Sequence, residues 1–229
     1  MSQLIIPYQK NTKQTFDSYY SNDPSNENII ECIKTIFTSK NSQIFIWGEN
    51  CSGKSHILYS TCNYFSKDDK KCVYLPLKDY KSFNEDIISS FDEYDLICID
   101  DIDYIFGLKE WEYSFFNLVN RVINKSKKII YTSSSSLSSK NIKLLDLQSR
   151  LSWGLVFKIN NADDFIKEKI LKKIIIEKEY NISLKICSYL LKREERSMLP
   201  LIDIIHKVGH HSFTTNKKVN IKDLRAILD

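Results

Sequence analysis

The stretch that decides the fold is Gly48-Glu49-Asn50-Cys51-Ser52-Gly53-Lys54-Ser55, which lies between an apolar run and a segment of helical length. Its fixed positions match G-x-x-x-x-G-K-[ST], the loop that wraps nucleotide phosphates. Glycines let the backbone approach phosphate, while loop N–H groups and a helix N-terminus supply a positive field. Lys54 would reach the outer phosphates, the Ser55 hydroxyl would bind Mg²⁺, and His56 follows directly. We therefore expect ADP or ATP with Mg²⁺ at residues 48–56, against the alternative of a chance Gly-Lys-Ser turn.

Short apolar runs on both sides of this loop have the length of β-strands. They are rich in Ile, Val, Tyr or Phe, and segments of helical length separate them. Buried strands that alternate with helices are typical of a mostly parallel sheet covered on both faces. We therefore predict the α/β class, with the sheet in a nucleotide-binding base domain of residues 15–160. The predicted strands are 43–47, 72–75, 96–99, 128–132 and 155–159.

The chain after residue 160 shows helical periodicity only. Apolar residues recur there at steps of four, as on the buried face of a helix. We predict a small all-helical lid domain of residues 161–229, with His210 and His211 as a solvated loop pair, and a flexible tail of residues 1–14. The predicted lid helices are 163–178, 184–191, 196–208 and 221–228.

Two carboxylates end the third predicted strand, which reads Leu96-Ile97-Cys98-Ile99-Asp100-Asp101. In a sheet with a phosphate-binding loop, this position is where an acid organises Mg²⁺. Asp100 is the candidate for that role, and Asp101 is a second candidate, which could orient an attacking water. The alternative is that the pair caps a helix or forms a turn, as such pairs do elsewhere.

Composition excludes several other classes of protein. The 229 residues are 42% hydrophobic and 27% charged, with 5 Gly and 4 Pro, as in a globular protein rich in regular structure. No run reaches the roughly 18 apolar residues of a membrane span, and the N-terminus lacks the core of a signal peptide, so we expect a cytoplasmic protein. The six cysteines form no CxxC pair or zinc-like cluster, and we expect most to be buried. The net charge of +4 identifies no partner.

A family resemblance extends these inferences. The phosphate-binding loop, the strand end with two carboxylates, the element Leu147-Gln148-Ser149-Arg150-Leu151-Ser152-Trp153-Gly154 and the helical C-terminal part together resemble the DnaA branch of the AAA+ ATPases. The resemblance implies that Arg150 is an arginine finger, which reaches the nucleotide held by a neighbouring subunit. It also implies a nucleotide-contacting arginine in the lid, for which Arg196 is the match by position and Arg193 the second choice. The alternative for Arg150 is a structural salt bridge.

Two features narrow the resemblance within that branch. DnaA initiators carry a helix-turn-helix domain after the lid, whereas this chain ends at Asp229, so we expect DNA contact mainly through a partner. The peptide Gln3-Leu4-Ile5-Ile6-Pro7 is similar to the Q-L-x-L-[FP] motif that docks into the replicative sliding clamp. The combination resembles the Hda group, regulatory inactivators of DnaA that act on DNA-loaded clamps and trigger hydrolysis of DnaA-bound ATP. It implies the clamp and DnaA as partners, a homodimer or nucleotide-dependent homo-oligomer, and no membrane partner.

One departure concerns ATP hydrolysis by the chain itself. DnaA-like ATPases usually follow the fourth strand with Thr-Ser-Asp or Thr-Gly-Asp, whereas here Thr132 is followed by Ser133, Ser134 and Ser135. We therefore expect a weak or inactive ATPase that activates the ATPase of DnaA, converts DnaA to its inactive form and so inhibits the initiation of DNA replication. The rival hypothesis is an autonomous AAA+ ATPase that loads or remodels a helicase, which should hydrolyse ATP and need no clamp peptide. A third hypothesis is a single-strand-DNA-binding adaptor.

Overall fold

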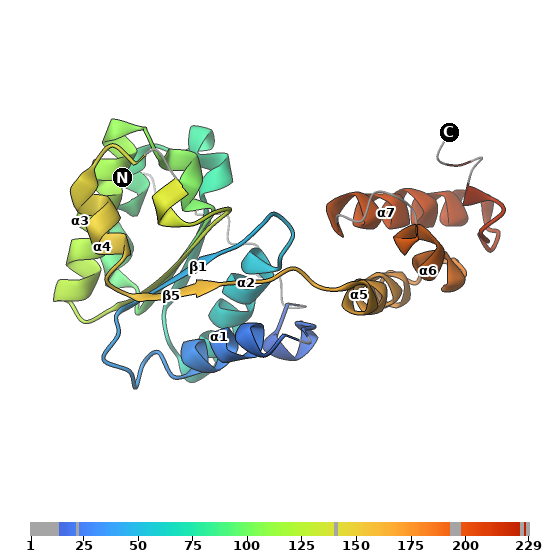
Figure 1. The fold of residues 1–229 in the computed structure, drawn as a ribbon, viewed down its shortest axis with the longest axis horizontal. Coiled ribbons are helices and arrows are strands. Elements are labelled where there is room, and N and C mark those ends of the chain that lie inside the picture. Colours follow the sequence, from blue (N-terminus) through green and yellow to red (C-terminus); the bar gives the residue numbers. More distant parts are fainter. Residues whose placement is uncertain (1–13, 22, 140–141, 193–197, 225–226, 228–229) are drawn as a thin grey trace. The chain divides into compact units, whose positions relative to one another are not determined.

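The computed structural model of the chain describes residues 14–21, 23–139, 142–192, 198–224 and 227. These residues fall into two compact units, which Figure 1 shows as ribbons. The first unit contains the described residues up to Tyr19 together with Asp23–Asn161, and the second contains Tyr20, Ser21 and the described residues from Ala162 onward. Each unit has a hydrophobic core of its own, as independent domains do.

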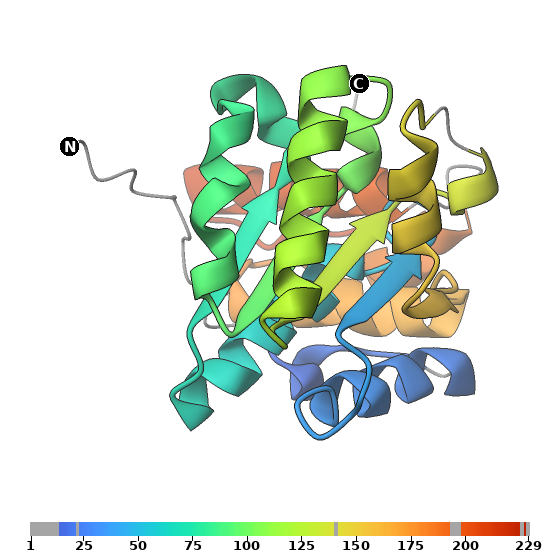
Figure 2. The same cartoon turned by 90° about the vertical axis from the view of Figure 1, so that its left-hand side faces the viewer.

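A five-stranded parallel sheet forms the centre of the first unit (Figure 2). Ile44 on β1 pairs with Ile130 of β4 on one side and with Leu155 of β5 on the other, so β1 lies inside the sheet. The strands follow the predicted runs closely, and the predicted α/β class is confirmed. In the spatial order of the sheet, they are β2 (Cys72–Pro76), β3 (Leu96–Asp100), β4 (Lys128–Ser133), β1 (Gln43–Trp47) and β5 (Leu155–Lys158).

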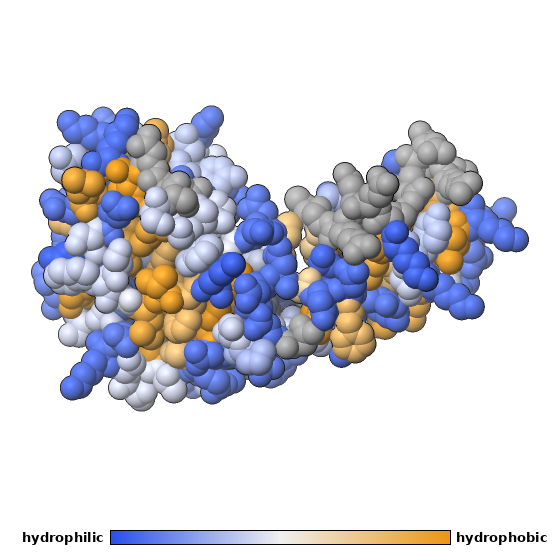
Figure 3. Space-filling model, in the orientation of Figure 1, coloured by the Kyte–Doolittle hydropathy of each residue, from blue (hydrophilic) through white to orange (hydrophobic). Residues whose placement is uncertain are grey.

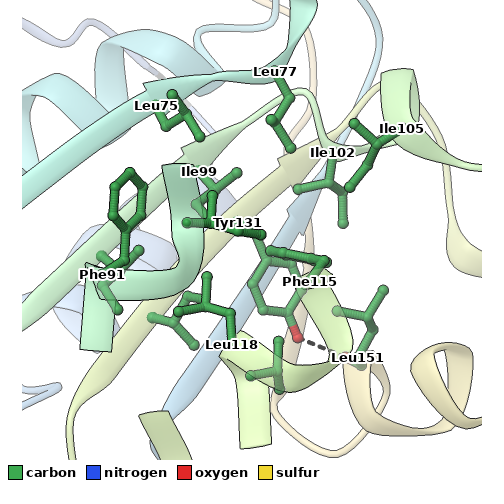
Figure 4. Close-up of a cluster of buried hydrophobic side chains, with 14 of the residues drawn as sticks. Leu75, Leu77, Phe91, Ile99, Ile102, Ile105, Phe115, Leu118, Tyr131 and Leu151 are labelled. Carbon is green, nitrogen blue, oxygen red and sulfur yellow. Dashed lines mark hydrogen bonds between the residues drawn. The ribbon is translucent and has the colours of Figure 1, made fainter. Parts of the chain in front are cut away.

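Side chains along the strands alternate between two hydrophobic cores. Phe45 belongs to the core that α3 and α4 cover, whereas Ile44 and Ile46 belong to the core that α1 and α2 cover. The two pairs of helices lie on opposite faces of the sheet (Figures 1 and 2), and Figure 4 shows Phe115 of α3 beside Tyr131 of β4 in the first core. The helices are α1 (Pro24–Lys34), α2 (Lys54–Phe65), α3 (Lys109–Asn124) and α4 (Leu145–Leu151).

Strand β5 forms one edge of the sheet, and short 3₁₀ helices lie between several of the longer elements of the first unit. Lys158 ends β5, and its ammonium lies 5.4 Å from the ring centroid of Trp47 on the neighbouring strand. Several connections contain short 3₁₀ helices, which the sequence pattern does not distinguish from loops. These segments are η1 (Phe16–Ser18), η2 (Ser66–Asp68), η3 (Leu77–Ser82), η4 (Glu85–Glu93), η5 (Ile102–Ile105) and η6 (Leu137–Ser139).

Helices α5 (Asp164–Glu177), α6 (Lys185–Leu191) and α7 (Met198–Thr215) build the second unit. They surround a core in which Leu171, Ile186 and Ile205 are fully buried. The face drawn in Figure 3 shows hydrophilic and hydrophobic residues side by side on the surface of each unit. A parallel β-bridge joins Ile182 and Val219. The first two helices match the predicted segments to within a residue, and the fourth predicted helix lies partly outside the described residues.

The third lid helix differs from the prediction. It continues to Thr215, seven residues past the predicted end, so His210 and His211 are exposed positions of α7 rather than a loop pair. Gly209 made an end at this point plausible, because glycine weakens helices. Here glycine is required by packing, since a Cβ at Gly209 would lie 2.5 Å from the ring of Tyr180.

Three further features of the described residues concern membrane-spanning helices, metal-binding clusters and the burial of cysteines. No helix there is long and apolar enough to cross a membrane. No group of three or more His, Cys, Asp or Glu residues there could hold a metal ion by itself. The cysteines are free, but only Cys62, Cys98 and Cys187 are buried, and Cys51 is exposed. The expectation that most cysteines are buried is therefore wrong, because Cys32 and Cys72 are partly exposed and Cys51 lies in a surface loop.

Candidate nucleotide-binding site

The loop of residues 48–53 connects the carboxyl end of β1 to the first turn of α2. Cys51 and Gly53 both have positive φ, 63° and 95°, a conformation that costs other residues more than glycine. A Cβ at Gly53 would lie 2.8 Å from the ring of Tyr19, and a Cβ at Gly48 would overlap Ile159. The two glycines of the motif are therefore needed for local packing as well as for an open loop.

Lys54 begins α2 and is buried. Its ammonium donates hydrogen bonds to the carbonyl oxygens of Gly48, at 2.8 Å, and Glu49, at 2.9 Å. Burial lowers the pKa of Lys54, and the negative charges of Asp101, Asp100 and, more weakly, Asp103 oppose that shift. The lysine is thus held over the loop, within the electrostatic reach of carboxylates from the neighbouring strand end.

The loop residues fit a phosphate group. The hydroxyl of Ser52 is buried and has no hydrogen-bond partner among the described residues. A buried polar group without a partner costs free energy, which a ligand oxygen could recover. Ser55 is exposed in the first turn of α2, where backbone N–H groups are free of helical partners. This donor set suits an anion at the helix N-terminus, with the Ser55 hydroxyl as an oxygen ligand for Mg²⁺.

Three other predicted loop residues have contacts outside the loop or lie at its surface. The Glu49 carboxylate accepts a hydrogen bond from the Asn161 amide at 2.6 Å. Asn50 is exposed. The His56 ring nitrogen lies 3.1 Å from both the Ser18 hydroxyl and the Thr15 carbonyl oxygen. His56 therefore joins α2 to the segment before α1.

Asp100 is the last residue of β3 and is 2% exposed. One carboxylate oxygen accepts a hydrogen bond from the Tyr74 hydroxyl at 2.8 Å, and the other accepts one from the Thr132 hydroxyl. Burial, followed by the Asp100 charge, raises the pKa of Tyr74, so this hydroxyl remains a donor. Each carboxylate oxygen has a second lone pair, so Asp100 can still donate an electron pair to Mg²⁺ or accept a hydrogen bond from a water bound to Mg²⁺.

Asp101 has a left-handed backbone, with φ 56° and ψ 50°, and lies at the N-cap of η5. Its side chain does not cap that helix, which argues against the capping alternative. Its N–H donates to the Thr132 hydroxyl at 3.0 Å. Burial, then the charge of Asp100, raises the pKa of Asp101 to about 6. A partly buried carboxyl with such a pKa at the end of β3 has the character of a proton-accepting group near neutral pH.

Sequence reasoning missed a third carboxylate at this edge of the sheet. Asp103 in η5 accepts two hydrogen bonds from Ser134, one from the N–H at 3.1 Å and one from the hydroxyl at 2.7 Å. Ser134 occupies the position where the family resemblance expects a carboxylate. The signal in the sequence was the third aspartate of Asp100-Asp101-Ile102-Asp103, which lies next to the end of β4 because β3 and β4 are paired.

Arg150 lies in the last turn of α4, and its guanidinium carbon is 4.2 Å from the ring centroid of Trp153. No carboxylate among the described residues pairs with it, which argues against the salt-bridge alternative. The Arg150 carbonyl accepts a hydrogen bond from the Gln43 amide at 2.7 Å. The Tyr131 hydroxyl donates to the Leu151 carbonyl at 3.0 Å, as Figure 4 shows, and to Gln43 Oε1 at 3.2 Å. Buried side chains of the sheet therefore fix the helix end that carries Arg150.

The remaining predicted site residues cannot be located. The peptide Gln3-Leu4-Ile5-Ile6-Pro7, Arg193 and Arg196 lie outside the described residues. The described residues bring together the loop, Asp100 and Asp101 at the carboxyl edge of the sheet. They leave Arg150 at its amino edge, beside Gln43 at the start of β1.

Comparison with known proteins identifies the family. Residues 10–158, more than half of the chain, match the bacterial DnaA ATPase domain. The chain belongs to this family. It is therefore related to the replication initiator DnaA and has the AAA+ nucleotide-binding fold.

Individual proteins are similar to this chain over most of its length. An uncharacterized protein of Haemophilus influenzae is 27% identical over 99% of this chain and 98% of its own length. Domain III of DnaA from Thermotoga maritima has a TM-score of 0.81 and 21% identity, and the match covers 95% of this chain and 96% of that one. AMPPCP-bound DnaA from Aquifex aeolicus has a TM-score of 0.72 and 21% identity over 95% of this chain and 71% of its own. The solved structures share the fold.

Proposed function

We propose that this protein is a cytoplasmic regulatory inactivator of DnaA, like the Hda group. It binds ADP or ATP with Mg²⁺ through residues 48–56, Asp100 and the lid arginine, docks on the DNA-loaded sliding clamp through residues 3–7, and delivers Arg150 to ATP bound by DnaA. Hydrolysis of that ATP lowers the supply of active initiator and limits the initiation of replication.

The observation that carries the proposal is the separation of Arg150 from the chain's own phosphate-binding loop. The carbonyl oxygen of Arg150 accepts a hydrogen bond from the side chain of Gln43 at the start of β1, whereas Gly48 follows the end of the same strand. Five residues of strand at about 3.3 Å each span roughly 16 Å, which is longer than an arginine side chain. A guanidinium at this edge supports action on a nucleotide held by another molecule.

The chemistry of phosphoryl transfer explains what such an arginine contributes. Negative charge is spread over the transferring phosphoryl group in the transition state, and a guanidinium placed there stabilises it. Arginine fingers delivered by a second molecule increase the rate about a thousandfold or more. No carboxylate among the described residues neutralises the charge of Arg150 in an ion pair.

Tethering explains why a clamp peptide would accompany this arginine. A contact between two ATPase subunits can be weak when the molecules are free in solution. Attachment of one partner through a short flexible segment raises its effective concentration into the millimolar range. The clamp on DNA would thus restrict inactivation to DnaA near replicating DNA.

The decisive experiment measures hydrolysis of DnaA-bound ATP with DNA-loaded clamp. Wild type should stimulate hydrolysis, and Arg150→Ala should remove stimulation while leaving the melting temperature and nucleotide binding unchanged. Arg150→Lys should not restore it, because an ammonium lacks the planar fork that grips two oxygens. Lys67→Ala, which removes an exposed cation elsewhere on the first unit, serves as the control.

Two outcomes would contradict the proposal. Full stimulation by a folded Arg150→Ala variant would make the arginine structural. Rapid phosphate release from ATP by the isolated chain, without stimulation of DnaA, would favour the helicase loader or remodeller instead.

A further inference from the structure

The carboxylate of Asp103 is fixed at the phosphate-binding edge of the sheet. Both of its oxygens accept hydrogen bonds from Ser134, at 3.1 Å and 2.7 Å. Donors to both oxygens favour the ionised form of a carboxyl group. Asp103 is therefore a fixed negative charge rather than a freely moving surface side chain.

Neighbouring contacts locate this charge beside the loop. The N–H of Gly48 donates to the carbonyl oxygen of Ser133 at 3.2 Å, so the residue before Ser134 is bonded to the first glycine of the loop. The N–H of Asp101 donates to the Thr132 hydroxyl at 3.0 Å, which links the ends of β3 and β4. Asp103 also acts electrostatically on Lys54 and Asp101. The group that would hold the outer phosphates thus lies within the field of Asp103.

The charges at this edge are unbalanced for a triphosphate. Among the described residues, Asp100, Asp101 and Asp103 contribute three carboxylates, which act on the ammonium of Lys54, and a second ammonium, that of Lys78, acts on Asp101. A γ-phosphate adds further negative charge at the end of the ligand, where like charges repel most strongly. A divalent cation between phosphate and carboxylates would reverse that interaction.

We propose that Asp103 is a specificity-determining residue of the nucleotide site: its fixed carboxylate makes binding of a nucleoside triphosphate depend on Mg²⁺ more strongly than binding of the diphosphate. This inference rests on the proposed nucleotide binding. The family resemblance expects a carboxylate at position 134, where this chain has Ser134. The inference gives that negative charge to Asp103, whose carboxylate accepts hydrogen bonds from Ser134. Without Mg²⁺, the chain would favour ADP over ATP.

Calorimetric titration with ATP and ADP, in Mg²⁺ or in EDTA, tests the inference. Asp103→Asn keeps an oxygen acceptor for the Ser134 N–H and removes the charge. It should strengthen ATP binding in EDTA by about tenfold, as expected for one charge at intermediate distance in a partly screened site, and should change ADP binding much less. Asp68→Asn, which removes an exposed carboxylate elsewhere on the first unit, is the matched control and should bind both nucleotides like wild type.

The outcomes separate this inference from the proposal on which it rests. If wild type binds Mg²⁺-ATP and Asp103→Asn shifts ATP and ADP equally, or neither, the role of Asp103 is refuted and nucleotide binding stands. If wild type binds no nucleotide, both fail. Should Asp103→Asn not fold, the exchange variant Asp103→Ser with Ser134→Asp decides: retention of the wild-type Mg²⁺ dependence supports the inference, and its loss overturns it.

Discussion

The guanidinium of Arg150 is stacked on the ring of Trp153, with 4.2 Å between the guanidinium carbon and the ring centroid. Trp153 is 65% exposed, so the pair lies at the surface of the first unit. A stacked arginine keeps its N–H groups available around the rim of the plane. Trp153 therefore orients the guanidinium of Arg150 and leaves its N–H groups available for hydrogen bonds to another molecule.

This stacking predicts a graded effect of substitutions at Trp153. Because an exposed cation–π contact is worth about 0.5–1 kcal/mol, Trp153→Ala should lower stimulation of DnaA-bound ATP hydrolysis about two- to fivefold, far less than Arg150→Ala. Trp153→Phe keeps an aromatic face and should retain most of the stimulation. Equal loss in the alanine and phenylalanine variants would mean that the ring contacts the partner instead of orienting Arg150.

The Tyr131 hydroxyl should be important for stability. Tyr131→Phe leaves the buried acceptors Leu151 O and Gln43 Oε1 without their donor, which should lower the free energy of unfolding by about 1–3 kcal/mol. Urea denaturation measures this change. Tyr113→Phe, at a ring that is 47% exposed, should change stability by less than about 0.5 kcal/mol. Similar values for both variants would show that the bonds at the end of α4 contribute little.

Asp101 should make stability depend on pH in a defined direction. Its pKa is raised from 3.8 to about 6 in the folded chain, so the folded state binds the proton more tightly. The free energy of unfolding should therefore fall as pH rises from about 4 to about 6. In EDTA, Asp101→Asn should be more stable than wild type above pH 6, and this advantage should vanish below about pH 4. The exposed Asp68→Asn is the control, and a pH-independent difference at Asp101 would contradict the assignment.

The rate at which Cys51 reacts with a thiol reagent should show whether nucleotide occupies the phosphate-binding loop. Cys51 is exposed and lies two residues before Gly53 in the loop, so bound nucleotide should slow its reaction with a thiol reagent severalfold. Lys54→Ala should abolish nucleotide binding, and with it the protection. Cys51→Ser identifies the contribution of other thiols to the signal. Unchanged labelling of Cys51 at saturating nucleotide would show that the phosphates bind elsewhere.

Deletion of residues 3–7 should remove clamp binding and leave nucleotide binding unchanged. A peptide with three or four apolar anchors binds at around micromolar Kd, about 8 kcal/mol, which surface plasmon resonance with immobilised clamp can measure. A variant with the same five residues in reversed order controls for composition. Retained binding by either variant would assign clamp docking to another surface.

The sequence predicted the elements that depend on local pattern. Runs such as Gln43–Trp47 are strands because apolar residues fill both faces of the strand, and the phosphate-binding loop was recognisable because its glycines and lysine have fixed spacing. The length of α7 was not predictable in this way, because a glycine can end a helix or serve its packing, and only the fold shows that Gly209 packs against the Tyr180 ring.

The features of the candidate site that the sequence did not predict depend on contacts between distant segments. Nothing near Asp103 in the sequence indicates Ser134, which is 31 residues away and reaches it only because β3 and β4 pair in parallel. The bonds of Gln43 and Tyr131 to the end of α4 have the same origin, since strands β1 and β4 bring both side chains under that helix end. The sequence therefore predicts which side chains can act chemically, whereas their hydrogen-bond partners are known only from the fold.

The edge position of β5 has a consequence for the behaviour of the protein at high concentration. An open strand edge is a template for fibril growth, and natural proteins block it with short strands and lysines. β5 has four residues and ends in Lys158, whose ammonium lies over the ring of Trp47. This edge therefore resists main-chain pairing with another copy. Self-association at this end of the sheet is left to side-chain contacts, which single substitutions can dissociate.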